Sequence, residues 1–326
     1  MGASALHTRT MKRTITAQQG GNPTAATGTV TEPEAPASEA ETRAFLLSRA
    51  KRDFAVVLKD FVQVPAVKPH DPAQLRGAAL STFVKRGDLR GLQSYLFLCA
   101  IISSGDGDNG WSTTLPLAVW ARVFGTTSTA DPRSASSSAS KILTRLADRK
   151  LIERKRQGRD RKITVTLLHP DGNGEPFARE DDAGTVRPYL KLNNAYWTDG
   201  WYDKLDLPAT AMLLVALQEN PAGFRLPTAR MKTWYGWSPD TAERGLKTLV
   251  ELGLIEKTYV LEKAPLSPTG LTRTNVYKVL APFRRSDPTK KPRRRRGTRA
   301  AGSSTASKKL TPKNVTTKNA TTKGAP

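Results

Sequence analysis

Cysteine, histidine and long apolar runs are scarce in this chain of 326 residues. The single cysteine, Cys99, lies in the apolar run LFLCAII, so a framework of disulfides is excluded. The three histidines, His7, His70 and His169, are scattered, and no spacing suggests a zinc site. We therefore expect neither a metal ion nor another cofactor, and no pattern indicates a small-molecule ligand.

Signals for membrane insertion, export and catalysis are also missing. No stretch approaches the ~18 consecutive apolar residues that a membrane span needs, and residues 1–19 contain no apolar signal core. The chain has no Walker loop, and no pair of histidines resembles the metal site of a nicking enzyme. We expect a cytoplasmic, nucleoid-associated protein that is not an enzyme.

Acidic residues are few, and basic residues gather at the C-terminal end. The chain has 52 Lys and Arg against 29 Asp and Glu, a formal net charge of +23. Residues 284–326 hold 14 Lys and Arg and one acid, a net charge of +13. This balance favours a polyanionic partner, either nucleic acid or an anionic membrane surface. We interpret the segment as a non-specific phosphate clamp, and the plainer interpretation is a solvated, solubilising end.

The two ends of the chain lack hydrophobic periodicity. Residues 1–40 are rich in Thr, Ala, Gly, Pro and Glu, and residues 283–326 include the run KKPRRRR, so both are predicted to be disordered tails. Over residues 41–65, apolar residues recur at roughly helical spacing, which predicts an amphipathic helix that packs on a domain or pairs two subunits. Residues 66–87 and 171–186 are predicted linkers.

One sequence pattern occurs twice in the middle of the chain. LTRLADRKLIER at 143–154 corresponds to LKTLVELGLIEK at 246–257. The alternating segment RKITVTLL at 161–168 corresponds to RTNVYKVL at 273–280. With the apolar segments that precede them, both occurrences predict the same order: helix, short strand, helix, helix, strand, loop and strand.

We name residues 88–170 copy one and residues 187–282 copy two. In each copy an N-cap residue followed by proline starts the last helix, at Asp131-Pro132 and Ser238-Pro239. Three helices followed by a two-stranded hairpin is the pattern of a winged helix, a form of helix-turn-helix. The expected fold is therefore mainly α with small β-hairpins, an α+β class, with two tandem winged-helix domains between the tails.

Residues 143–168, LTRLADRKLIERKRQGRDRKITVTLL, resemble the recognition-helix end and wing of the multiple-antibiotic-resistance regulator (MarR) family. The resemblance rests on the leucine-rich helix, the LIER strand and the wing triplet Asp160-Arg161-Lys162. Lys150 stands where that family usually has glycine. The tandem arrangement over residues 88–281 instead resembles plasmid replication initiators, which carry two winged helices in one chain. The two resemblances imply different outputs, namely transcriptional regulation or replication initiation.

A recognition helix turns its apolar stripe inward and presents the opposite face to the major groove. That face and the wing of copy one supply most candidate DNA contacts: Arg133, Ser134, Ser137, Lys141, Arg145, Arg154, Arg156, Arg159, Arg161 and Lys162. Copy two supplies Thr241, Arg244, Lys247 and Arg273. The alternative without a ligand is that these charged residues form only a solvated surface.

The two copies differ in net charge. Residues 131–162 have 11 basic and four acidic residues, net +7, whereas residues 238–278 have six and five, net +1. Copy one is therefore expected to make most phosphate contacts. Copy two is expected either to bind DNA more weakly or to serve as a dimerisation or partner module.

We expect a bacterial protein that binds specific sequences of double-stranded DNA as a transcriptional regulator. One alternative is a plasmid or phage replication initiator that binds origin repeats. Another is a winged-helix protein-interaction scaffold whose tail binds nucleic acid non-specifically. The sequence leaves open whether the chain forms a homodimer. Trp197, Trp201 and Tyr202 either stack on single-stranded bases or, as their position before the first helix of copy two favours, fill the seam between the copies.

Overall fold

The computed structural model describes residues 35–67, 74–105, 110–128, 130–158, 162–181, 183–219 and 222–284. These residues mix α-helices with small antiparallel sheets, as the sequence predicted, and they cluster into one compact unit that ends at Arg284. The predicted disordered tails lie outside the described residues, apart from residues 35–40 and 283–284. No described helix has both the length and the apolar character needed to cross a membrane.

Copy one follows the predicted order of elements. In chain order these are α3 (Leu89–Ile101), β2 (Ser112–Pro116), α4 (Leu117–Val123), α5 (Pro132–Asp148), β3 (Ile152–Gln157) and β4 (Lys162–Leu167). Strand β2 joins the hairpin as a third strand, in the order β2-β4-β3. Asp131 caps α5 as predicted, because its carboxylate accepts hydrogen bonds from the backbone N–H groups of Arg133 and Ser134 at 3.0 and 3.1 Å.

Lys150 follows the end of α5 in an unusual backbone conformation. Its φ is +54°, the only positive value for a non-glycine residue in the described part of the chain. The matching residue of copy two is Gly253, with a φ of +70°. Glycine adopts this left-handed conformation at lower energy. The lysine that departs from the MarR pattern therefore occupies a position suited to glycine.

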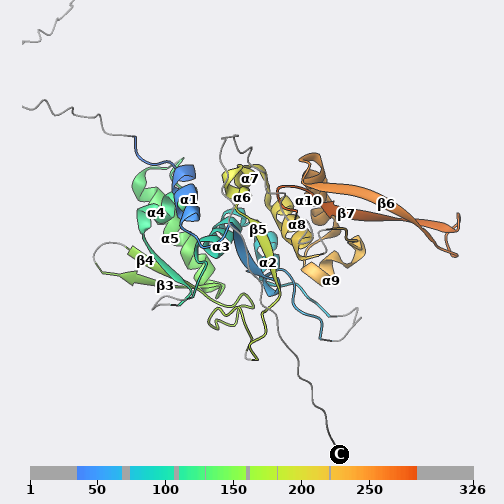
Figure 1. Ribbon diagram of the computed structural model, residues 1–326, viewed down its shortest axis with the longest axis horizontal. Coiled ribbons are helices and arrows are strands. Elements are labelled where there is room, and N and C mark those ends of the chain that lie inside the picture. Colours follow the sequence, from blue (N-terminus) through green and yellow to red (C-terminus); the bar gives the residue numbers. More distant parts are fainter. Residues whose placement is uncertain are drawn as a thin grey trace, which may run out of the picture. The chain divides into compact units, whose positions relative to one another are not determined.

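Copy two repeats the helices and the hairpin after an additional lead-in. Its elements are β5 (Tyr189–Asn193), α6 (Ala195–Thr198), α7 (Trp201–Lys204), α8 (Leu207–Gln218), the 3-10 turn η2 (Thr228–Arg230), α9 (Met231–Tyr235), α10 (Pro239–Glu251), β6 (Ile255–Lys263) and β7 (Leu271–Val279). The predicted short strand before α9 is reduced to one bridge between Phe224 and Tyr277. The β6–β7 hairpin projects away from the helices (Figure 1).

The prediction of a single helix over residues 41–65 is wrong beyond Ser48. Helix α1 (Glu39–Ser48) ends there, and the chain continues as strand β1 (Phe54–Leu58) and the 3-10 turn η1 (Lys59–Phe61). The segment FAVVL contains two adjacent β-branched valines and is almost fully buried, which favours a strand once a partner strand is present. The predicted linker 66–87 also contains a helix, α2 (Ala79–Arg86).

Strands β1 and β5 join the two halves of the chain. They pair antiparallel from Phe54 opposite Asn193 to Leu58 opposite Tyr189. Helix α3 packs on β1 and helix α8, its counterpart in copy two, packs on β5, so each of these two helices covers one strand of the pair. Figure 1 shows β5 between α3 of copy one and α8 of copy two.

The segment after β5 packs on copy one. Trp197 of α6 contacts Phe97 of α3 edge to face, with ring centroids 5.6 Å apart. The side-chain amide of Gln93 in α3 donates a hydrogen bond to the carbonyl oxygen of Tyr202 at 2.6 Å. Trp197 and Tyr202 are each only 7% exposed, which confirms that these two aromatic residues fill the seam between the copies.

The segment after β1 packs reciprocally on copy two. Lys59 Nζ donates to the carbonyl oxygen of Gln218 at the end of α8, at 2.7 Å. The amide of Gln63 donates to the carbonyl oxygen of Trp234 at 3.2 Å and accepts from the amide of Gln218 at 3.2 Å. Each lead-in segment therefore stabilises the opposite copy.

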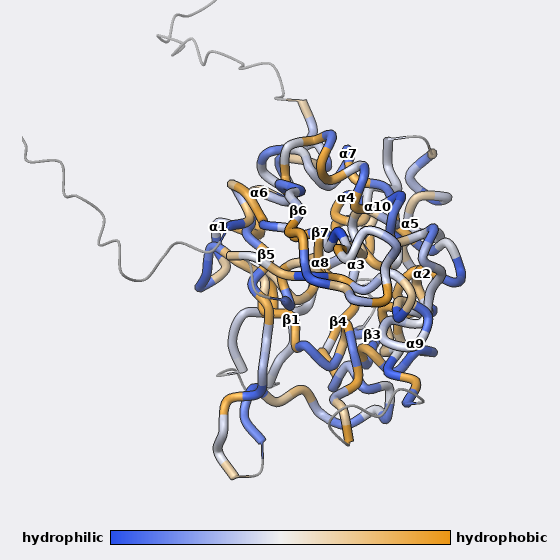
Figure 2. Tube along the Cα trace, turned by 90° about the vertical axis from the view of Figure 1, so that its right-hand side faces the viewer, coloured by the Kyte–Doolittle hydropathy of each residue, from blue (hydrophilic) through white to orange (hydrophobic). Residues whose placement is uncertain are grey.

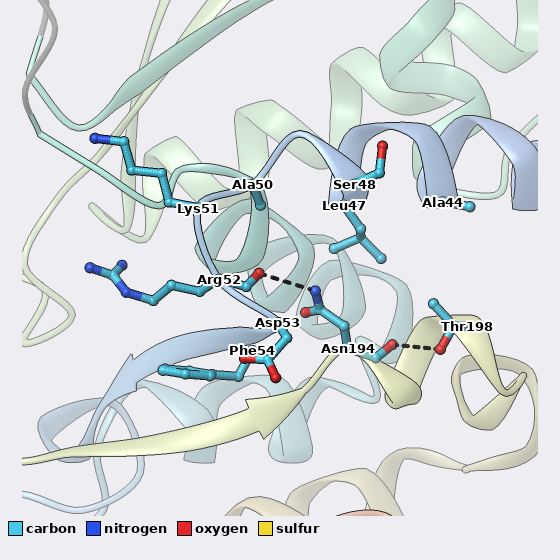
Figure 3. Close-up of a pocket in the computed structure, with 10 residues that line it drawn as sticks. All are labelled: Ala44, Leu47, Ser48, Ala50, Lys51, Arg52, Asp53, Phe54, Asn194 and Thr198. Atoms are coloured by element: carbon cyan, nitrogen blue, oxygen red, sulfur yellow. Dashed lines mark hydrogen bonds between the residues drawn. The ribbon is translucent and has the colours of Figure 1, made fainter. Parts of the chain in front are cut away.

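A shallow pocket of about 750 Å³ lies where α1, β1 and α6 meet (Figure 3). Hydrogen bonds hold its walls together: the Asn194 amide donates to the carbonyl oxygen of Arg52 at 3.3 Å, and the Arg52 guanidinium donates to the carbonyl oxygen of Ser103 at 2.6 Å. Its lining includes one carboxylate, Asp53, and neither histidine nor cysteine. We interpret the pocket as the joint between these three elements.

Gly245 provides a test of how closely α10 packs on α8. A Cβ atom at this position would collide with the carbonyl oxygen of Pro208 and lie 2.8 Å from Cγ of Met212. We predict that Gly245→Ala lowers the free energy of unfolding by about 1–3 kcal/mol, measured by chemical denaturation. Gly223→Ala is the matched control, because its Cβ would meet only Cγ1 of Val276, at 3.9 Å. Equal stabilities of the two variants would contradict the close contact.

Candidate nucleic-acid interface

Helix α5 has one buried face and one exposed face. The buried face packs into the core of copy one through Ala135, Ala139, Ile142, Leu143 and Leu146. The opposite face exposes Arg133, Ser134, Ser137 and Lys141. Arg133 and Lys141 are eight residues apart, which corresponds to about 12 Å along a helix. In the described part of the chain, no carboxylate pairs with either of these two side chains.

Small side chains separate the two cations. Residues 134–140 read SASSSAS, so the helix backbone is covered only thinly on this side. An α-helix is about 10–12 Å wide with its side chains, and the major groove of B-DNA is about 12 Å wide. The exposed face of α5 therefore has the size and the charge to approach base edges.

An ion-pair cluster fixes the C-terminal end of α5. Asp88 caps α3 by accepting from the backbone N–H of Gly91 at 3.0 Å, and its carboxylate also lies 3.1 Å from the guanidinium of Arg145 and 2.6 Å from that of Arg149. The Arg149 guanidinium also stacks on the Phe83 ring at 4.2 Å. Arg145, a predicted DNA contact, is thus held by Asp88. Sequence reasoning missed Asp88, because only its capping position is visible locally.

The pKa of Asp88 is set by its burial and by these two arginines. Burial by itself raises the pKa of this carboxyl group, but the hydrogen bonds and charges of Arg145 and Arg149 outweigh burial and hold the pKa below its ordinary value. The carboxylate therefore stays ionised over the neutral pH range and continues to orient α5.

The turn between α4 and α5 is also fixed. Thr126 Oγ1 lies 3.0 Å from the carbonyl oxygens of both Ala121 and Ala135. The carboxylate of Glu39, at the start of α1, accepts hydrogen bonds from the backbone N–H groups of Thr127 and Ser128 at 2.8 and 3.0 Å. No sequence signal could reveal this contact, because Glu39 lies almost 90 residues from the turn.

The β3–β4 hairpin is attached to α5 through Arg154. Its guanidinium donates to the carbonyl oxygen of Ser140 at 3.0 Å and to Thr144 Oγ1 at 2.5 Å. Arg154, another predicted DNA contact, therefore connects the hairpin to the helix. Arg156 and Lys162 are exposed on the hairpin. The predicted contacts Arg159 and Arg161 lie outside the described residues.

Three of the four predicted DNA contacts of copy two interact with neighbouring side chains. The Thr241 hydroxyl lies 2.9 Å from Ser238 Oγ at the start of α10, and Lys247 pairs with Glu251 at 3.8 Å. Arg244 is exposed, whereas the guanidinium of Arg273 lies over the Tyr259 ring at 3.8 Å on the hairpin. Acidic Asp240, Glu243 and Glu251 are also exposed on α10. This helix consequently presents mixed charge.

No group of three or more His, Cys, Asp or Glu side chains in the described ranges is placed to hold a metal ion. Comparison of the chain with known proteins finds no matching family model, no matching curated protein and no matching solved structure.

Replacing Asp88 with asparagine separates its charge from its capping role. We predict that Asp88→Asn keeps a side-chain acceptor for Gly91 but lowers the free energy of unfolding by about 1.5–3 kcal/mol at neutral pH, because the arginines lose their ionised partner.

The pH dependence follows from the lowered pKa of Asp88. A carboxyl group with a lowered pKa in the folded state contributes stability above its ordinary pKa, here 3.8, and loses it as pH falls through the folded-state value. The difference in stability between wild type and Asp88→Asn, measured by denaturation at a series of pH values, should therefore shrink below pH 3.8. A difference that stayed constant into acid, or was absent at pH 7, would argue against this ion-pair cluster.

Proposed function

We propose that both copies are winged helices and that copy one binds duplex DNA with sequence specificity. Helix α5 would enter the major groove, and the β3–β4 hairpin would contact the adjacent backbone. The observation that carries the proposal is the exposed face of α5, where Arg133 and Lys141 flank a run of small side chains. Arginine and lysine side chains are suited to the acceptor atoms of guanine and to phosphates.

The fixed orientation of α5 supports the same proposal. Asp88 anchors one end, the Glu39–Thr127 contact holds the turn before it, and Arg154 attaches the hairpin. A site that discriminates between sequences needs its side chains held in place before binding. Residues 284–326, with their net charge of +13, would add non-specific affinity for phosphates.

We propose a bacterial transcriptional regulator as the biological role, acting without a catalytic step. A replication initiator that binds origin repeats is the second candidate, because strands β1 and β5 build two copies of one pattern into a single unit. A protein-interaction scaffold would instead use the mixed charge of α10. Removal of residues 285–326 separates this third candidate, since a scaffold would then lose all affinity for DNA.

The test is binding selection from random duplex DNA at physiological salt, with and without residues 285–326. We expect wild type to enrich a sequence motif, and Arg133→Ala/Lys141→Ala to lower affinity for that motif roughly ten- to hundred-fold. An inverted repeat at a promoter would favour a regulator, and direct repeats would favour an initiator.

Lys85→Ala/Arg86→Ala is the matched control, because it removes the same charge from exposed positions of α2. This variant should enrich the same motif as wild type. The proposal fails if no motif is enriched, or if the α5 variant and the α2 variant behave alike.

A further inference from the structure

The β6–β7 hairpin extends well beyond the core that it covers. Its strands have nine residues each, against six in β3 and in β4. Ile255 and Val279 pair at the root and are buried, with exposures of 1% and 0%. Farther out, Tyr259 is 53% exposed and Leu261 is 58% exposed. Figure 2, in which this hairpin is nearest the viewer, shows hydrophobic and hydrophilic stretches along it.

The two faces of the hairpin differ in charge. Residues directly opposite each other share a face, and alternate residues along a strand point to opposite faces. What we term the inner face continues from the buried root outward and comprises Lys257, Tyr259, Leu261, Lys263, Leu271, Arg273, Asn275 and Tyr277. It carries three cations and no carboxylate.

The carboxylates of the hairpin lie on the other, outer face. Glu256 pairs with Lys278 at 3.5 Å, and Glu262 pairs with Arg225 at 2.5 Å. The hydrogen bonds from Thr274 and Arg225 hold the pKa of Glu262 below its ordinary value, so that charge is retained on the outer face. The segregation favours an anionic ligand on the inner face.

The exposed apolar groups of the inner face indicate what else this ligand contains. The guanidinium of Arg273 lies over the ring of Tyr259, 3.8 Å from the ring centroid. Leu261 and Leu271 lie on the same face of the hairpin. Exposed aromatic rings beside cations are the platform on which unpaired bases stack. A duplex keeps its bases stacked inside and offers mainly phosphates and groove edges, so it leaves these apolar groups without a partner.

The root of the hairpin limits where the ligand binds. A groove of about 560 Å³ separates α10 from the hairpin there, and its lining includes Glu243, Glu251 and Lys257. In copy one, Arg154 attaches the hairpin to the helix through Ser140 and Thr144. In the repeat, the matching positions of copy two are Lys257, Glu243 and Lys247. The attachment therefore has no counterpart in copy two. Because Glu243 and Glu251 repel phosphates, the anionic ligand is placed on the outer half of the hairpin.

We propose that the inner face of the β6–β7 hairpin, around Tyr259 and Arg273, binds single-stranded nucleic acid, with bases stacking on Tyr259 and phosphates on Lys263 and Arg273. A second copy of the chain is a poorer occupant, because two inner faces would bring three cations against three. This site is separate from the duplex interface proposed on α5 and does not depend on it.

The test is photo-cross-linking of the full-length protein to a single-stranded oligodeoxynucleotide of about 20 nucleotides, longer than a typical single-strand site, with 5-iodouracil in place of thymine. We expect a covalent adduct on Tyr259, found by mass spectrometry in the tryptic peptide of residues 258–263. Tyr259→Trp should keep an adduct at this position, and Tyr259→Ser should bind the oligonucleotide about tenfold more weakly.

Arg273→Gln/Lys263→Gln tests the cations while Tyr259 is left in place. It should lower the yield of the Tyr259 adduct several-fold, whereas Lys278→Gln, on the outer face, should not. Unlabelled single strands should compete for the site, and deoxyribo- and ribo-oligonucleotides used separately identify the preferred strand.

Several outcomes overturn the proposal. These are adducts found only outside the hairpin, an equal yield in the inner-face and outer-face variants, and competition by an acidic peptide or by duplex DNA that equals competition by the single strand. Arg133→Ala/Lys141→Ala should leave the Tyr259 adduct unchanged. If the adduct forms but duplex selection finds no motif, only the duplex proposal fails, and the converse result rejects only this one.

Discussion

The antiparallel pairing of β1 with β5 is the constraint on which the rest of the structure depends. In the described part of the chain neither strand has another partner, so separating the copies would leave buried backbone donors and acceptors unpaired. The reciprocal packing adds to this: Trp197 stabilises copy one, and Lys59 and Gln63 stabilise copy two. The two copies are therefore built as one unit.

Within this unit the copies differ at matching positions. In copy one Arg154 ties the hairpin to α5, and the exposed helix face is basic. In copy two a lysine replaces that arginine, acids appear on α10, and the hairpin is longer and carries exposed Tyr259. The same backbone pattern thus presents a compact basic surface in one copy and an open groove with a projecting arm in the other. This difference is the physical basis for proposing different ligands for them.

The elements inside each copy could be predicted from the sequence because their signals are local. N-caps at Asp131 and Ser238, the apolar stripes of the helices and the alternation in β4 act over a few residues. The β1 strand and the exchanged contacts could not be predicted, because their partners lie a hundred residues or more away along the chain. The local pattern of residues 41–65 therefore predicts a single helix. Only the pairing with β5, which is distant in the sequence, makes part of this segment the strand β1.

The candidate site was predictable as a surface but not residue by residue. Counting charges treats Arg133, Arg145 and Arg154 alike, whereas the fold places Arg145 on Asp88 and Arg154 on Ser140 and leaves Arg133 exposed. Which cation is available to a ligand is a property of tertiary structure. The sequence pattern located helix α5, and the ion pairs and hydrogen bonds of the fold determine which cations on and near it stay exposed.

The most direct test of the central claim is the placement of α5 on bound DNA. An iron chelate attached to Ser137→Cys would cut nearby DNA, and Cys99 should not react because burial raises the pKa of its thiol to about 12. On the duplex of highest affinity, we predict one cluster of cuts on each strand, flanking a single major groove. The same chelate at Thr185→Cys, on an exposed loop, should cut weakly and without focus. Cleavage from position 137 as diffuse as that from position 185 would contradict the account.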